Sequence, residues 1–133
     1  MLRVHEVAPV GVAGLTLGGG ISHFSHRRGW ACDNVAVYEV VTASGLIVNA
    51  SPTSYADLYW ALRGGSGNFG VVTNFKLAAF PLGGMWGGSR LYLEAQIPAV
   101  LDAMYSFTTL RSSQDPDAAE IVVCFPFASP PIL

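Results

Sequence analysis

Most of the glycines in this 133-residue chain lie in two segments, Gly11–Val35 and Asp57–Thr73, where backbone groups could bind a ligand. Glycine has no Cβ atom, so its N–H and carbonyl groups can approach a bound molecule closely and adopt positive φ angles. Successive N–H groups arranged in this way can bind phosphate oxygens. The two segments together predict a site for a large flat or phosphorylated ligand.

The stretch Gly65–Gly70 reads GSGNFG and has the spacing of a dinucleotide-binding motif. That motif needs a strand before it, a helix after it and an acidic residue about 20 positions further on. Here a helix is expected before the stretch and a strand after it, which argues against a nicotinamide-binding fold. Two interpretations remain: a tight helix-to-strand connection, or backbone around Gly70–Val72 that hydrogen-bonds a ligand. No phosphate-binding P-loop sequence occurs.

Two histidines and a cysteine, His23, His26 and Cys32, are the side chains that could coordinate a metal or form a nucleophile–base pair. A structural zinc site needs four ligands, and the other candidates, His5, Asp33 and Cys124, lack motif spacing. A Cys/His pair also needs a third group to orient the base, and none is evident. We therefore predict ordinary polar histidines, no metal site and no catalytic side chain.

Regular elements are expected on either side of the glycine segments. Ser54 is a good helix cap, and Tyr55, Leu58, Tyr59 and Leu62 would share one apolar helical face that ends at Arg63. Before and after this helix, β-branched residues predict strands. The expected elements are an extended segment over Val10–Leu17, strands over Val35–Val41, Leu46–Asn49 and Gly70–Leu77, and the helix that precedes the last strand.

The remainder of the chain has a different pattern, which predicts a second unit. Arg90–Glu94 alternates like a strand, Pro98 suits the first turn of a helix, and Ile97–Tyr105 carries one apolar helical face. A turn at Asp115–Asp117 leads to an expected strand over Ile121–Phe125. These elements would form a β-α-β arrangement with too few strands to be stable alone.

The composition is apolar, with 51% hydrophobic and 12% charged residues and a net charge of −2. So few charges leave little polar surface for a small free-standing body, which predicts apolar faces that need a partner surface. The tryptophans are expected in a core or an interface. Without a large basic cluster, nucleic-acid binding has little support. The apolar run at the N-terminus is too short and too glycine-rich for a membrane span, and it makes a poor signal peptide.

The two segments, GVAGLTLGGGISHFSHRRGWACDNVAVYEVVTASG and DLYWALRGGSGNFGVVTNF, occur in this order and are followed by a proline. Together they resemble the second half of the FAD-binding domain of the vanillyl-alcohol oxidase / p-cresol methylhydroxylase (PCMH) superfamily. The resemblance is to its berberine-bridge-enzyme-like branch of fungal-style flavin oxidases, and it covers about Val7–Leu82. It implies an α+β fold, a partial PCMH-type FAD-binding domain over residues 1–82, and the beginning of an α/β substrate domain over residues 83–133.

The resemblance also implies the cofactor and its contacts. FAD would be bound mainly through backbone, with the flavin, ribityl and pyrophosphate near the first glycine segment and the adenine–ribose end near the strand. Asp33 and Asn34 would fix the turn into the strand at Val35. The implied cofactor-binding residues are Gly14, Gly18, Gly19, Gly20, Ile21, Ser22, Gly70, Val71 and Val72.

Parts of the family pattern have no counterpart in this chain. These are the first half of the FAD domain with its phosphate-binding loop and attachment histidine, the attachment cysteine expected before Pro9, and the catalytic base. The resemblance therefore implies a truncated piece of an oxidoreductase that transfers hydride from an alcohol, sugar or secondary-metabolite carbon to FAD. The alternatives are a non-catalytic remnant and an interaction module that pairs with a complementary polypeptide or with itself. Full-length relatives are often secreted, but nothing in this sequence assigns a compartment.

Overall fold

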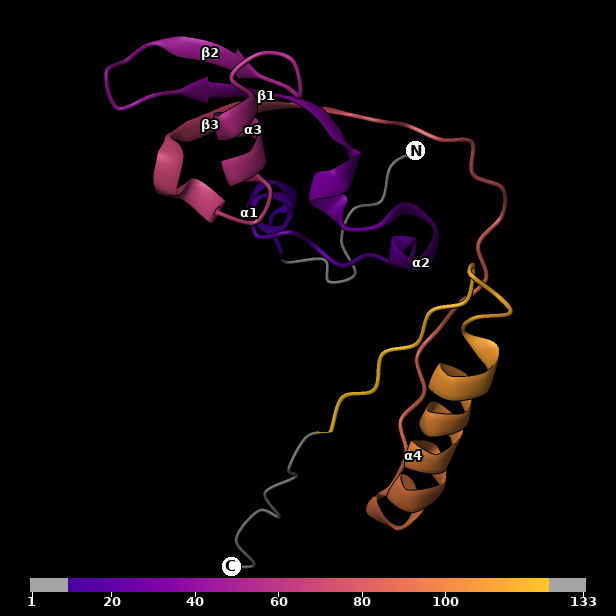
Figure 1. Ribbon diagram of the computed structural model, residues 1–133. Helices are drawn as coiled ribbons and strands as arrows, with labels where there is room; N and C mark the ends of the chain where they lie inside the picture. The colour runs from indigo at the N-terminus through magenta and orange to yellow at the C-terminus, as the bar shows by residue number, and fades with distance from the viewer. Residues whose placement is uncertain (1–9, 125–133) are drawn as a thin grey trace, which may run out of the picture. The chain divides into compact units, whose positions relative to one another are not determined.

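The computed structural model describes residues 10–124, which fall into two compact units divided between Gly87 and Gly88. The first unit contains the three labelled strands and helices α1 to α3, and the second contains helix α4 (Figure 1). A small antiparallel sheet with helices gives the α+β class expected from the sequence. The proposed domains at 1–82 and 83–133 remain predictions, because compactness alone does not show what either part does.

The sheet of the first unit has the strand order β2-β1-β3, with both pairs antiparallel. Its central strand is β1 (Val35–Val41), flanked by β2 (Ile47–Ala50) and β3 (Val71–Leu77). These three strands confirm the predicted ones to within a residue at each end. A turn joins β1 to β2, where the Thr42 N–H donates to the Leu46 carbonyl and Gly45 has a φ of 82°.

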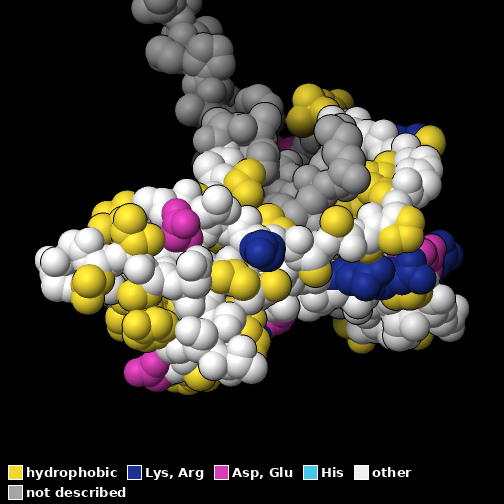
Figure 2. Space-filling model, turned by 90° about the horizontal axis from the view of Figure 1, so that it is seen from above, with side chains coloured by type: hydrophobic (Ala, Val, Ile, Leu, Met, Phe, Trp, Pro, Cys, Tyr) yellow, Lys and Arg dark blue, Asp and Glu magenta, His cyan; other side chains and the backbone are white. Residues whose placement is uncertain are grey.

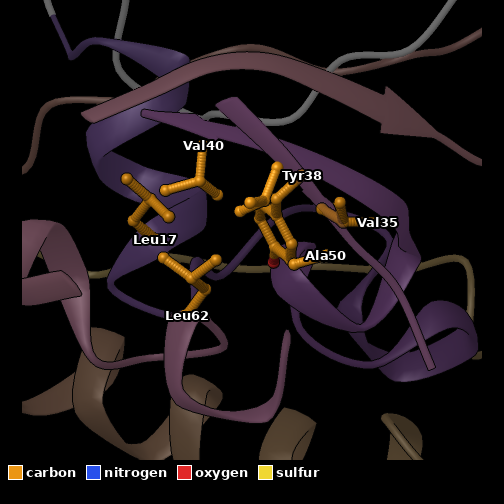
Figure 3. Close-up of a cluster of buried hydrophobic side chains, with 7 residues drawn as sticks. Leu17, Val35, Tyr38, Val40, Ala50 and Leu62 are labelled. Carbon is orange, nitrogen blue, oxygen red and sulfur yellow. The ribbon is translucent and has the colours of Figure 1, made fainter. Parts of the chain in front are cut away.

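The core lies on one face of this sheet. Tyr38 stands opposite Ala50 on β2 and Phe75 on β3, and Val40 stands opposite Val48 and Val72. Figure 3 shows Leu17 and Leu62 on the same side of the sheet as Val40 and Tyr38, with which they form one buried cluster. Because side chains alternate between faces along a strand, the residues between them lie on the other face. The helices that supply Leu17 and Leu62 therefore cover only the core face.

Helix α3 (Ala56–Leu62) was predicted nearly correctly, but its cap was not. Leu58, Tyr59 and Leu62 pack on the core as expected, whereas Tyr55 is exposed. The predicted cap, Ser54, is wrong: Tyr55 occupies the cap position with a φ of 50°, and no side chain caps the helix. Ser54 instead makes reciprocal backbone hydrogen bonds with Ser51, so it belongs to the turn before the helix.

The segment Val10–Leu17 is not extended as predicted, because Val12–Leu17 forms helix α1. The Thr16 hydroxyl donates to the Val12 carbonyl at 2.8 Å, and Thr16 and Leu17 are buried. Tertiary burial of one face stabilises this short helix, which contains a glycine and would not be stable in isolation. A single-turn helix, α2 (Ser25–Arg28), and a 3-10 turn, Ala31–Asn34, lead from α1 into β1.

The second unit contains helix α4 (Ile97–Ser106), with Pro98 in its first turn as predicted, followed by a π-helical turn, Phe107–Arg111. The predicted strands at Arg90–Glu94 and Ile121–Phe125 are wrong for every residue that the structure describes, and Phe125 lies outside the described residues. An alternating sequence becomes a strand only when another strand pairs with its backbone. The described residues of the second unit therefore do not form the expected β-α-β arrangement.

Many hydrophobic side chains are exposed in both units. Figure 2 shows them on one face, among uncharged groups and a few charged ones. The tryptophans predicted for a core or interface are not in the core: Trp30, Trp60 and Trp86 are 54%, 76% and 99% exposed. Among the described helices, none has both the length and the apolar character to cross a bilayer.

Candidate functional site: the glycine turn and its supports

The first glycine segment forms a tight turn, Gly18–Gly20, directly after α1. Gly19 and Gly20 have φ angles of 105° and 83°, which side-chain-bearing residues rarely adopt. A Cβ atom on Gly20 would lie 2.7 Å from the Ala31 Cβ and 3.1 Å from the Leu15 carbonyl oxygen. Gly20 is therefore required both by its backbone conformation and by close packing.

The carbonyl groups of Gly19 and Gly20 are bound by the chain itself. The Gly20 carbonyl accepts the Ala31 N–H at 2.8 Å, and the Gly19 carbonyl accepts the Cys32 N–H at 2.9 Å. These two bonds place the turn against the 3-10 turn that leads into β1. With the Gly19 and Gly20 carbonyls bound in this way, these two residues can contact a ligand only through their N–H groups or their van der Waals surface.

The N–H groups of the predicted segment divide into two sets. Those of Gly18, Gly19 and Ser22 are bonded to the Gly14 carbonyl, the Thr16 carbonyl and the Ser25 hydroxyl. Within residues 10–124, the N–H groups of Gly20 and Ile21 have no such bond; Gly20 is buried, whereas Ile21 is 58% exposed. The structure thus leaves two adjacent donors at this end of the turn.

Two polar side chains, Asp33 and Asn34, brace the loop beside the turn, as the resemblance implied. Asp33 Oδ2 accepts the Trp30 N–H at 3.0 Å, and Asn34 Nδ2 donates to the carbonyls of Arg28 and Trp30, both at 2.9 Å. The Asn34 carbonyl also accepts the Ala78 N–H at 2.8 Å. Both side chains therefore fix the path of the chain into β1.

The second glycine segment follows a helix, α3, and precedes a strand, β3, as the sequence predicted. A 3-10 turn, Ser66–Phe69, lies between the two. A Cβ atom on Gly65 would lie 2.2 Å from the Ala61 carbonyl oxygen. At Gly70, where φ is 148°, it would lie 2.6 Å from the Val41 carbonyl oxygen. The glycines at these two positions are thus explained by close packing in a tight helix-to-strand connection.

The residues predicted from this segment lie on the sheet. Gly70 abuts the end of β1, Val72 packs against the core, and Val71 is 68% exposed. Gly70–Val72 and the Gly18–Gly20 turn come from different elements, and they are linked through the end of α3. There the Gly64 N–H donates to the Leu17 carbonyl at 3.0 Å.

The reactive side chains considered in the sequence do not form a reaction centre within residues 10–124. No group of three or more His, Cys, Asp or Glu side chains among these residues could hold a metal ion. Cys32 is buried, and burial, followed by the nearby Asp33 carboxylate, raises the pKa of its thiol. A thiol kept protonated in this way is a poor nucleophile.

Comparison with known proteins shows the family to which this chain belongs. The FAD binding domain family matches residues 1–51. The FAD-dependent monooxygenase tpcD of Cochliobolus heterostrophus is 61% identical over 83 residues, which are 62% of this chain and 16% of that protein. The carbohydrate oxidase of Microdochium nivale, solved with a substrate analogue, matches 60% of this chain at 44% identity with a TM-score of 0.56. The chain belongs to the PCMH-type FAD-binding superfamily.

A second solved member of the superfamily is the glucooligosaccharide oxidase of Acremonium strictum, which has a 6-S-cysteinyl, 8α-N1-histidyl FAD. It matches 56% of this chain at 45% identity with a TM-score of 0.52. The chain spans only 16% to 17% of the length of these three proteins. The cofactor of the superfamily is FAD, and this chain carries part of the FAD-binding domain of its oxidoreductases.

The described residues are suited to binding FAD through backbone groups rather than through side chains. FAD carries a pyrophosphate, which binds well to backbone N–H groups at a glycine turn. The N–H groups of Gly20 and Ile21, which have no partner within residues 10–124, are donors of this kind. The sequence predicted nine contact residues but could not single out these two donors. Which N–H groups already have a hydrogen-bond partner within the chain is known only from the folded structure.

Proposed function

We propose that this chain forms one side of the FAD site of an oxidoreductase that oxidises an alcohol, sugar or secondary-metabolite carbon. The observation that carries the proposal is the Gly18–Gly20 turn, where the Gly19 and Gly20 carbonyls are bound internally while, among the described residues, the Gly20 and Ile21 N–H groups have no partner. The carbohydrate oxidase of Microdochium nivale supports a small-molecule substrate of this class. When bound, FAD supplies the electron acceptor for hydride transfer from the substrate carbon.

In this proposal the chain's residues bind and orient rather than react. The Gly20 and Ile21 N–H groups donate to the FAD pyrophosphate, while Gly14, Gly18, Gly19 and Ser22 line the approach. A side chain at Gly14 would meet open space within the described residues, which leaves room for a ligand beside α1. We assign the adenine–ribose end to Gly70, Val71 and Val72, and we assign no catalytic side chain.

We further propose that residues 1–82 form the FAD-binding part and that residues 83–133 begin a substrate domain. Helix α4 supports the second assignment, since its apolar residues Ile97, Leu101 and Met104 are at least 36% exposed within the described chain. An amphipathic helix with an uncovered apolar face normally packs against a further layer of structure. A substrate domain in a longer polypeptide would provide that layer.

The alternative proposal is a non-catalytic piece or an interaction module that pairs with a complementary polypeptide or self-associates. The exposed apolar side chains favour it, with Trp60 and Trp86 at 76% and 99% exposure. A ligand pocket normally encloses most of its ligand, and one side of a pocket binds correspondingly more weakly. This alternative predicts association without stable FAD retention.

The deciding experiment is an absorption spectrum of the purified chain after incubation with FAD and gel filtration. We expect retained flavin bands at roughly 370 and 450 nm, because the glycine turn is intact in this chain. The matched pair is Gly20→Ala, which disturbs the turn, and Gly45→Ala, which places the same change in the distant β1–β2 turn. Retention by Gly45→Ala but not by Gly20→Ala supports the proposal.

A folded chain that elutes without flavin would refute FAD binding by this chain. Elution at the position of a dimer or larger species, again without flavin, would favour the interaction module. Circular dichroism of the same fractions checks that each variant remains folded, so that lost flavin is not confused with lost structure.

A further inference from the structure

An ion pair links the end of α3 to the loop that supports the glycine turn. Arg63 follows α3 directly, and its Nη2 donates to Asp33 Oδ1 across 30 positions of sequence. The Arg63 guanidinium also lies 5.7 Å from the centre of the Tyr59 ring. Both charged side chains are about one-third exposed, at 34% and 32%. The guanidinium is thus held between an aromatic ring and a carboxylate at the edge of the core.

Asp33 connects the ion pair to the glycine turn through the backbone N–H groups of three neighbouring residues, Trp30, Ala31 and Cys32. Its second oxygen accepts the Trp30 N–H, and the next two N–H groups, those of Ala31 and Cys32, bind the carbonyls of Gly20 and Gly19. The Trp30 ring also lies 3.5 Å from the place that a Cβ of Gly19 would occupy. One carboxylate therefore fixes the loop that holds both positive-φ glycines of the turn.

The end of α3 reaches the turn a second time through backbone. The Gly64 N–H donates to the carbonyl of Leu17, the last residue of α1 and the one before the turn. The Gly18–Gly20 turn is thereby held from both sides, at its start by Gly64 and at its end by the loop that Asp33 and Arg63 brace. Glycine has the largest backbone freedom of any residue, so a glycine turn needs such external contacts to keep one shape.

We propose that Asp33 and Arg63 are positioning residues that keep the Gly18–Gly20 turn in the conformation that binds FAD. This inference rests on the proposed function of the turn. Neither residue need touch FAD: the pair raises the fraction of chains in which the turn is correctly shaped, and the apparent affinity rises in proportion to that fraction. The hydrogen bond between the two side chains lowers the pKa of Asp33 and raises the pKa of Arg63, so both remain charged and paired.

The test compares Arg63→Gln with Arg63→Lys and with a control, Lys76→Gln, which removes one positive charge from the exposed side of β3. The first measurement, on the FAD-free chain, is amide hydrogen exchange of Ala31 and Cys32, with Val40 in β1 as an internal reference. The second is the dissociation constant for FAD, followed by flavin fluorescence. Arg63→Lys keeps the charge and one donor, so it also provides a folded variant should Arg63→Gln not fold.

In Arg63→Gln we expect exchange at Ala31 and Cys32 to rise about two- to fivefold and FAD binding to weaken by a similar factor, as suits a partly exposed ion pair. Val40 should not change, Arg63→Lys should recover much of both effects, and Lys76→Gln should resemble the wild type. A purely structural role would instead raise exchange at Val40 together with the other two amides, and this result would overturn the proposal.

Failure of this inference differs from failure of the proposed function. If the wild-type chain does not bind FAD, the proposed function fails, and the role of the pair in FAD binding fails with it. If the wild type binds FAD but Arg63→Gln loosens Ala31 and Cys32 without changing the dissociation constant, only the positioning role is overturned. Unchanged exchange at both amides would overturn the link between the ion pair and the turn.

Discussion

Tyr38 and Tyr59 pack with their ring centres 5.7 Å apart, yet their hydroxyl groups have opposite surroundings. The Tyr59 hydroxyl donates to the Val35 carbonyl at 2.7 Å. The Tyr38 hydroxyl is buried, and within the described residues it has no hydrogen-bond partner. Burial, with smaller contributions from Cys32 and Tyr59, raises the pKa of Tyr38. The two hydroxyls should therefore contribute to stability with different signs.

Replacing each tyrosine by phenylalanine tests this difference. Tyr59→Phe removes a hydrogen bond and leaves the Val35 carbonyl unsatisfied, so we expect a loss of about 1 to 2 kcal/mol in the free energy of unfolding. Tyr38→Phe removes a buried group that lacks a partner, so we expect no loss or a small gain. Urea unfolding measures both. A larger loss for Tyr38→Phe would mean that its hydroxyl binds a buried water.

Gly20→Ala should destabilise the chain more than Gly45→Ala does. Both positions have a φ near 82°, but a Cβ on Gly45 meets nothing within 4 Å, whereas one on Gly20 would overlap Ala31. We expect a cost of about 1 kcal/mol at Gly45 and about 2 to 4 kcal/mol at Gly20, where overpacking adds to backbone strain. Thermal or urea unfolding gives the comparison. Equal costs would contradict the close packing of Gly20.

Leu62 and Trp60 provide a similar comparison on helix α3. Leu62 is fully buried beneath the sheet, whereas Trp60 is 76% exposed on the same helix. We expect Leu62→Ala to cost about 2 to 5 kcal/mol through the cavity it leaves. Trp60→Ala should change stability by about 0.5 kcal/mol or less. A large cost at Trp60, measured with the purified chain, would reveal a surface that covers this side of α3.

Prediction of the first unit from sequence succeeded where a local pattern and the core agree. The β-branched run at Val35–Val41 and the apolar spacing of Leu58, Tyr59 and Leu62 describe faces that the core does bury. The prediction of an extended segment over Val10–Leu17 failed, because the burial of Thr16 and Leu17 in the fold stabilises a helix there. At Arg90–Glu94 the alternation is present, but no strand among the described residues pairs with it.

For the site, FAD is confirmed as the cofactor of the family, the glycine contacts stay a prediction, and the sequence did not show how the turn is held. The Arg63–Asp33 pair joins residues 30 positions apart, and the bonds to the Gly19 and Gly20 carbonyls come from another element. No spacing rule relates such residues, because their proximity arises only when α3 docks on the sheet. That the Gly20 and Ile21 N–H groups have no partner among the described residues could likewise be seen only in the folded structure.

Stability at acid pH should depend on Asp33. Its pKa in the fold is lowered, chiefly by the hydrogen bond from Arg63, so the unfolded chain binds a proton more readily than the folded one. The stabilisation is therefore complete above the unfolded value of 3.8 and is lost as the pH falls through the lower folded value. For this partly exposed pair we expect a difference of about 1 kcal/mol or less.

The measurement for Asp33 is urea unfolding at pH 7 and at pH 3 for the wild type and Asp33→Asn. The variant should lose less stability between the two pH values, because it has no carboxylate to protonate there. Asp57→Asn is the control. It removes a carboxylate that, within the described residues, accepts a hydrogen bond from the N–H of the next residue, Leu58, and has no ion-pair partner. An identical pH dependence in wild type and Asp33→Asn would refute the role of Asp33.

The two cysteines should react with thiol reagents at very different rates. Cys124 is exposed, whereas Cys32 is buried and has a raised pKa. At pH 8 we expect rapid labelling of about one thiol per chain, followed by a second phase limited by opening of the fold. In Cys124→Ser the fast phase should disappear, and mass spectrometry can confirm the site. Fast labelling in that variant would show that Cys32 is accessible.

The hydrogen bond from Gly64 to Leu17 also has a consequence for the order of folding. It closes a loop that includes β1, β2 and α3, so the glycine turn cannot take its final shape until that whole stretch has collapsed. Closing such a loop costs chain entropy before the contact is gained. Competence to bind the cofactor would therefore emerge as one of the last events on the folding pathway, after the hairpin has formed.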